Sequence, residues 1–197
     1  MLVGTGRYSL THLLRGQRGT EDAIGNPTPA GARVVILNTA IQPLPIAEAD
    51  LGLPWNWRIG PGNAAPTDAI MQALIFTPSG RGLVPFSPAQ ARMRREANGD
   101  LAIRWIRRDR ALSADSWVLA DAPMSEAAES YDLEILNGGT VVRTVSGLTS
   151  PAFTYTAVLQ TTDFGGPVTS LDLLIYQVGA LGRGVPLTTT LSISEAT

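Results

Sequence analysis

The alternating run at residues 101–105, Leu-Ala-Ile-Arg-Trp, constrains the fold of this chain most strongly. Successive side chains of a β-strand point to opposite faces, so a run in which large apolar residues alternate with small or charged ones predicts a strand with one buried face. A second alternating segment, Ala91–Arg94, precedes it across Asn98-Gly99, a pair that favours a tight turn between strands. These residues predict a β-hairpin with Trp105 facing a core.

Similar patterns continue through the second half of the chain. Tyr131, Leu133 and Ile135 alternate with acidic residues, and Asn137-Gly138-Gly139 predicts a turn into another strand at 140–145. Further strands are predicted at 153–158, 171–175 and 187–193, with a loop at 179–186 before the last. The 20 glycines and 14 prolines are spread along the whole chain, which suits short strands joined by turns. Residues 86–197 therefore predict a β-sandwich.

Residues 1–85 are less regular, and we interpret them as an N-terminal β domain. Strands are predicted at 7–10, 33–37, 55–59 and 71–76, and loops at 26–29 and 42–45. The segment has few large apolar residues for a complete core, so we expect strands or a surface of another chain to complete it. The predicted fold class is all-β, a partner-dependent N-terminal β domain followed by a sandwich.

The composition disfavours catalysis. Cysteine is absent and His12 is the only histidine, which excludes disulfides, thiolate nucleophiles, cysteine-type zinc sites and multi-histidine metal sites within one chain. A Ser-His-Asp arrangement would require His12, but no carboxylate lies near it in the sequence, and Thr11 and Leu13 suggest a strand. We therefore expect a structural histidine, no cofactor, no metal and no enzymatic activity.

Two other patterns that could indicate a chemical site have simpler interpretations. Gly4-x-Gly6 and Gly16-x-x-Gly19 lack the spacing of phosphate-binding loops, so they predict turns. Two acidic pairs could serve hydrolysis, but the Ser- and Ala-rich sequence around 125–130 favours a solvated loop; the pairs are Glu126 with Glu129 and Asp115 with Asp121.

Charge is distributed in two opposite blocks. Residues 81–110 hold eight arginines against three acidic residues, and residues 111–136 hold six acidic residues and no basic one, within a net charge of −2. Because a nucleic-acid-binding face is usually uncompensated, we expect no nucleic-acid binding. The two blocks are expected to meet within the sandwich or across a subunit boundary. The sequence has no apolar run long enough for a membrane span. Residues 1–8 have neither a charged n-region nor an apolar h-region, so we do not expect secretion by a signal peptide.

Four residues are candidates for an interface. Trp55 and Trp57 would emerge on the same side of a strand, where they could stack on a sugar ring, although buried packing or an interchain contact is favoured. Arg107 and Arg108 end the basic block. If the two blocks meet across a subunit boundary, reversing both arginines to glutamate should weaken assembly.

Three motifs resemble a fibronectin type III domain over residues 86–197. They are Leu101-x-Ile103-x-Trp105, Tyr131-x-Leu133-x-Ile135 and Gly182-x-Gly184-x-Pro186. In that family a core tryptophan lies on the second strand and a glycine-containing loop precedes the last strand. Leu171 departs from the pattern, because it stands where a corner tyrosine usually opens the penultimate strand.

A second resemblance spans nearly the whole chain through short segments in order. The segments are Leu13–Glu21, Trp57–Pro61, Phe76–Pro78, Pro85–Pro88, Gly99–Leu101, Trp105–Arg108, Tyr131–Val142 and Asp163–Gly184. In this order they are similar to the C-terminal part of the megatron, or host-specificity protein, the large baseplate protein of gene transfer agents and related siphophages. That protein is far longer, with hub domains and a TIM-barrel-like domain upstream, so Met1 is expected to open either a split gene product or a fragment.

The resemblance implies a structural role in a virion. It implies a tail-tip or baseplate component, made in the host cytoplasm, that forms a homotrimer, docks on the tail hub and presents the sandwich for fibre attachment or host recognition. The host-surface receptor would be a glycan or a protein. The alternative is a carbohydrate-binding accessory module that targets a particle or an enzyme to cell-surface glycan.

Overall fold

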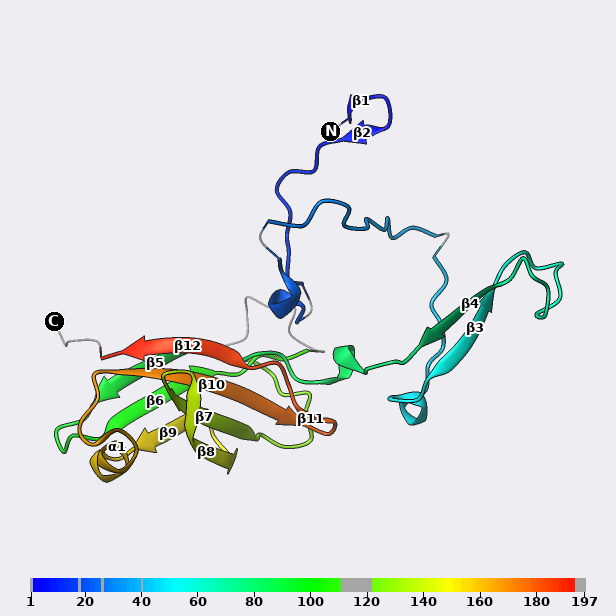
Figure 1. The fold of residues 1–197 in the computed structure, drawn as a ribbon. Helices are drawn as coiled ribbons and strands as arrows, with labels where there is room; N and C mark the ends of the chain where they lie inside the picture. The colour runs from blue at the N-terminus through cyan, green and yellow to red at the C-terminus, as the bar shows by residue number, and fades with distance from the viewer. Residues whose placement is uncertain (1, 18, 26, 40, 111–121, 194–197) are drawn as a thin grey trace. The chain divides into compact units, whose positions relative to one another are not determined.

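The chain folds as two compact units. The computed structural model describes residues 2–17, 19–25, 27–39, 41–110 and 122–193 (Figure 1). One unit comprises Met1–Thr28 with Gly82–Thr197, and the other comprises Pro29–Arg81. The N-terminal segment thus groups with the sandwich, and the second unit ends near the expected boundary at residue 85. Within the described residues, no helix is long and apolar enough to cross a membrane.

Two antiparallel sheets form a β-sandwich in the larger unit (Figure 1). The three-stranded sheet has the order β5-β6-β9, with β5 at Ala89–Arg95, β6 at Leu101–Ile106 and β9 at Ala152–Tyr155. The second sheet has the order β11-β10-β7-β8, and β12 also pairs with β10. Its strands are β7 (Tyr131–Asn137), β8 (Thr140–Leu148), β10 (Ser170–Gly179), β11 (Gly182–Arg183) and β12 (Leu187–Ser192). The predicted all-β class with a β-sandwich in the second half of the chain is confirmed.

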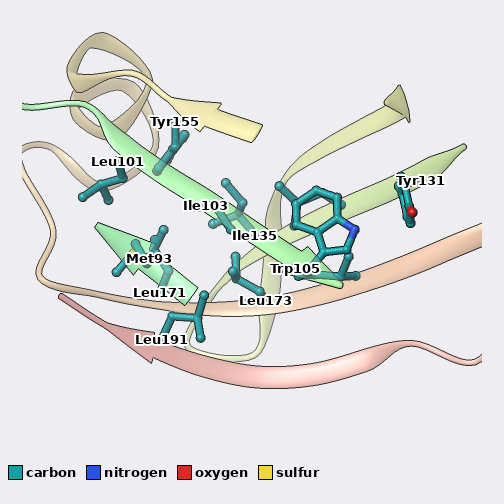
Figure 2. Packing of buried hydrophobic residues seen from close by; sticks show 12 residues of the cluster. Met93, Leu101, Ile103, Trp105, Tyr131, Ile135, Tyr155, Leu171, Leu173 and Leu191 are labelled. Atoms are coloured by element: carbon teal, nitrogen blue, oxygen red, sulfur yellow. The ribbon is translucent and has the colours of Figure 1, made fainter. Parts of the chain in front are cut away.

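The core lies between the two sheets and follows the predicted alternation. On β6 the side chains of Leu101, Ile103 and Trp105 are buried. Trp105 meets Tyr131 of β7 edge-on, with ring centroids 5.3 Å apart. Figure 2 shows these side chains converging with those of the other strands; the buried apolar cluster consists of Met93, Leu101, Ile103, Trp105, Tyr131, Leu133, Ile135, Tyr155, Leu171, Leu173, Ile175 and Leu191. The predicted core tryptophan on the second sandwich strand is therefore present.

The turn between β7 and β8 shows why the predicted hairpin forms. Asn137 pairs with Thr140, which leaves Gly138 and Gly139 as the two connecting residues. Their φ angles are 58° and 82°, so both adopt the left-handed conformation that a tight two-residue hairpin turn requires and that glycine adopts without a steric penalty.

The strand predicted at 153–158 is too long. Strand β9 ends at Tyr155, and helix α1 begins at Ala157 and runs to Phe164. The Thr156 side chain accepts a hydrogen bond from the Leu159 amide at 3.2 Å, and the Asp100 carboxylate accepts one from the Ala157 amide at 2.8 Å. These two oxygens satisfy amide groups at the start of the helix, so capping overrides the strand pattern.

A tyrosine at the end of β9 is hydrogen-bonded to helix α1. Leu171, the residue that departs from the fibronectin pattern, is buried near the start of β10. The hydroxyl of Tyr155, at the end of β9, donates to the Asp163 carboxylate of α1 at 2.6 Å. Burial raises the pKa of Tyr155, and the hydrogen bond to Asp163 raises it further. The phenol therefore stays neutral and can donate.

The first half contains less regular structure than predicted. Its strands are β1 (Leu2–Gly4) with β2 (Arg7–Tyr8), and β3 (Trp55–Ile59) with β4 (Gln72–Phe76); short 3-10 turns lie at Glu21–Ala23, Glu48–Asp50 and Arg81–Leu83. The strand predicted at 33–37 is wrong, because those residues have no regular structure. The strand suggested around His12 is likewise absent. In the part of the chain that the structure describes, neither segment has a neighbouring strand to supply ladder hydrogen bonds.

Candidate interaction surfaces

The β3–β4 hairpin is the only sheet among the described residues of the 29–81 unit. Trp55 pairs with Phe76, Trp57 with Leu74, and Ile59 with Gln72. Since alternate residues share a face, one face gathers the large apolar side chains of Trp55, Trp57, Ile59, Leu74 and Phe76. We call these five residues the apolar face of the hairpin.

The apolar face is poorly covered. Phe76, Leu74 and Ile59 are 45%, 51% and 53% exposed, and both tryptophans are partly exposed. A two-stranded hairpin alone is marginally stable in water, and it needs further strands or a packed layer to bury such a face. The described part of the 29–81 unit provides neither, which fits the expectation that this half of the chain lacks a complete core.

The two candidate tryptophans contact each other. The rings of Trp55 and Trp57 stack with centroids 5.4 Å apart and planes 26° apart. They emerge on the same face of β3, as the spacing predicts. The Trp57 Nε1 group is shielded from solvent and has no hydrogen-bond partner among the described residues. The sequence alone did not identify Leu74 and Phe76 as their neighbours across the hairpin, because strand pairing cannot be read from one strand.

A second apolar segment of the same unit is more exposed. Val34, Val35, Ile36 and Leu37 form a continuous run whose members are between 68% and 84% exposed. The residues 33–37 have no strand partner in the described structure, and no backbone hydrogen bond joins them to it. Four consecutive exposed aliphatic side chains are unusual on a monomer surface. We call residues 33–37 the unpaired segment.

The opposite charge blocks meet within the sandwich unit. Arg107 donates to Glu129 at 3.2 Å and to the Ala122 carbonyl at 2.8 Å, and Arg110 pairs with Glu126 at 2.7 Å. Glu126 is buried and Glu129 also accepts from the Tyr131 hydroxyl. The expectation of solvated carboxylates here is therefore wrong. The other acidic pair, Asp115 with Asp121, lies outside the described residues.

Arg108 connects the sandwich to the N-terminal segment. Its guanidinium forms an ion pair with Glu21 and lies over the Phe86 ring, 5.2 Å from the centroid. Gly19 lies against the same ring, so close that a Cβ at this position would be 2.5 Å from a ring carbon. No sequence signal links residues this far apart. We call Gly19, Glu21, Phe86 and Arg108 the N-terminal latch.

The residues considered for catalysis are not gathered into one site. His12 is exposed, and its ring nitrogen Nδ1 lies 3.2 Å from the hydroxyl of its neighbour Thr11. Gly4 and Gly6 lie at the β1–β2 connection, where the sequence predicts a turn. The described part of the chain holds no cluster of three or more metal-ligating side chains. Trp55 and Trp57 lie in one unit and Arg107 and Arg108 in the other.

A family model matches the beginning of the chain. Residues 1–35 match the model Rcc01698-like, C-terminal. The matched residues include Gly19 and Glu21 of the N-terminal latch and residues 33–35 of the unpaired segment. No curated protein matches the chain.

Solved structures similar to the chain include extracellular and fibronectin type III domains. Domains d3–d4 of the rat CD45 extracellular region are 14% identical, with 84% of this chain and 76% of that chain covered and a TM-score of 0.39. A Fn3-like protein from Clostridium thermocellum is 13% identical, with 58% and 98% covered and a TM-score of 0.37. The fibronectin type-III domain of human fibronectin type III domain containing protein 3 is 14% identical, with 57% and 89% covered and a TM-score of 0.36.

Proposed function

We propose that this protein is a non-enzymatic structural component of a phage or gene-transfer-agent tail tip. One observation carries the proposal: the sandwich has its own buried core, whereas the 29–81 unit leaves a hairpin face and a run of aliphatic side chains exposed. A chain with this asymmetry is suited to assembly. The family match over residues 1–35, which has a description related to gene transfer agents, supports the particle setting.

In this role the N-terminal half and the sandwich perform different tasks. The N-terminal half docks on the tail hub, and the sandwich carries fibres or contacts a host-surface glycan or protein. By the resemblance to the megatron, the assembled form is a homotrimer in the virion. Binding energy comes from burying apolar area and a few large side chains, such as those of the apolar face, rather than from bond chemistry.

Quantitative mass spectrometry of purified tailed particles from the source organism tests the proposal. The expected result is that this chain is present at low copy number, in a fixed ratio to the other tail proteins and consistent with a threefold component. Absence from infectious or gene-transferring particles would overturn the proposal.

The carbohydrate-binding alternative is distinguished by a separate assay. Saturable glycan binding by the full chain that is lost in Trp55→Ala, combined with absence from particles, would favour that alternative. The matched control is Ile75→Ala, because Ile75 lies on the opposite face of the same hairpin. A tail-tip component that docks through its N-terminal half should show no saturable glycan binding that depends on Trp55.

A further inference from the structure

The 29–81 unit contains two features that each lack a partner. The β3–β4 hairpin has a free edge on each strand, because among the described residues each strand pairs only with the other. The unpaired segment, residues 33–37, has strand-forming residues but no ladder hydrogen bonds. A free sheet edge offers the backbone donors and acceptors that an unpaired segment lacks.

Side-chain chemistry makes the same two features complementary. In a strand, Val34 and Ile36 would point to one face and Val35 and Leu37 to the other. Placed beside the hairpin, one aliphatic pair would extend the apolar face of Trp55, Trp57, Ile59, Leu74 and Phe76. Aromatic and β-branched side chains on adjacent strands form favourable cross-strand pairs.

We propose that residues 33–37 of one chain add as a β-strand to the free edge of the β3–β4 hairpin of a second copy of this chain. The inference rests on the proposed function in one respect, because it takes the 29–81 unit to be completed on assembly. It then names a second copy of this chain as the partner that completes the unit. Within a single chain the structure forms no pairing between the two features. A second copy supplies each feature with the other.

The charge of the unit favours a second copy over an oppositely charged partner. Residues 29–81 contain three arginines and three acidic residues, Arg33, Arg58 and Arg81 against Glu48, Asp50 and Asp68. This balance avoids repulsion between identical units, and it offers no field that would attract a polyanion or an acidic surface. Main-chain pairing plus apolar burial is the mode of recognition that remains.

The native chain has no cysteine, so a single introduced cysteine is the only thiol that a crosslinker can modify. Full-length Ile36→Cys and a tagged full-length Ile75→Cys are mixed and treated with a short bismaleimide. Both side chains are exposed in the free chain, at 75% and 69%, so both variants should fold. The expected product is a crosslinked dimer that contains one chain of each kind. The matched control replaces Ile36→Cys with Val158→Cys, a 74% exposed site on helix α1, and should give only background product.

A second variant separates assembly from folding. Ile36→Asp should weaken self-association of the full chain by about tenfold or more, because a charge would enter an apolar contact. Val158→Asp should leave self-association unchanged, and both variants should keep the thermal transition of the sandwich. Equal self-association of Ile36→Asp and the native chain would overturn the inference.

Two further outcomes would also overturn it. One is a chain that stays monomeric at about 100 μM, far above the micromolar range typical of weak specific contacts. The other is a crosslink that forms only within one chain when Ile36→Cys and Ile75→Cys are combined. Neither outcome affects the proposed function, because the presence of the chain in purified particles is measured independently.

Discussion

Arg143 and Asp163 form a two-point ion pair that links strand β8 to helix α1. Arg143 donates from Nε to Oδ2 at 2.6 Å and from its terminal nitrogen to Oδ1 at 2.8 Å. Asp163 Oδ2 also accepts from the Tyr155 hydroxyl of β9. A carboxylate on the short helix therefore connects elements of both sheets, since β8 belongs to one and β9 to the other.

Asp163→Asn should destabilise the sandwich by about 2 kcal/mol, because the charge-assisted hydrogen bonds from Arg143 are lost while its guanidinium stays in place. Urea unfolding followed by tryptophan fluorescence measures the change. Asp172→Asn is the control: its carboxylate accepts from Thr190 in an exposed setting, and we expect less than about 0.5 kcal/mol. Equal effects of the two substitutions would show that the ion pair has no special role.

Acid should weaken the sandwich through the same carboxylate. The hydrogen bonds from Arg143 hold the pKa of Asp163 below its ordinary value near 3.8. The folded state thus prefers the ionised form, so this stabilisation is complete above the unfolded pKa and is lost as the pH falls through the folded pKa. Unfolding free energies measured between about pH 5 and pH 2 should fall more steeply for the native chain than for Asp163→Asn. Parallel curves would contradict the assignment.

Replacing each of two buried glutamines by leucine should change the stability of the sandwich by different amounts. Gln160 donates to the carbonyls of Gly99 and Tyr155 at 3.1 Å and accepts from the Val168 amide at 3.3 Å. Gln160→Leu removes all three of these hydrogen bonds inside the fold, although the Gly99 carbonyl keeps its bond from Arg95, and should cost about 3 kcal/mol. The Gln177 side-chain oxygen is buried and has no hydrogen-bond partner in the described part of the chain, so Gln177→Leu should cost less than about 1 kcal/mol or stabilise the fold. Calorimetric melting of both variants checks the order.

Arg108→Ala should release the N-terminal latch while preserving the sandwich. The substitution removes the ion pair with Glu21 and the contact with Phe86, and partly exposed pairs of this kind contribute less than about 1 kcal/mol. Limited proteolysis should therefore become faster within residues 19–24, with the melting temperature nearly unchanged. The double reversal Arg108→Glu with Glu21→Arg should restore part of the protection. Unchanged proteolysis in Arg108→Ala would mean that the latch does not hold the segment.

The sandwich could be predicted from sequence because its pattern is local. The alternation around Ile103 and Leu133 defines the buried faces, and Gly138-Gly139 defines a turn. The helix after Tyr155 has a local signal in its cap residue Thr156, but the apolar pattern at 153–158 favoured a strand, and the second capping residue, Asp100, lies in a distant turn. Residues that pair across long sequence separations, such as Glu21 with Arg108, carry no local signal.

The structure of the N-terminal half could not be predicted from local sequence patterns. The pattern at 33–37 predicts a strand that does not form, because a strand also needs a neighbour and the described chain supplies none. The apolar face became visible only when the register placed Leu74 opposite Trp57 and Phe76 opposite Trp55. The exposure of this apolar face depends on whether other parts of the chain pack against it, so neither strand alone predicts it.

Hydrogen–deuterium exchange of the full chain tests most directly the claim that the sandwich is self-sufficient and the 29–81 unit is not. At low concentration, amides of β6, β7 and β10 should exchange only through global unfolding, whereas residues 33–37 and the β3–β4 hairpin should exchange rapidly. Raising the concentration into the self-associating range should slow exchange in residues 33–37 and the hairpin alone. Strong protection of these residues in the monomer would contradict the account.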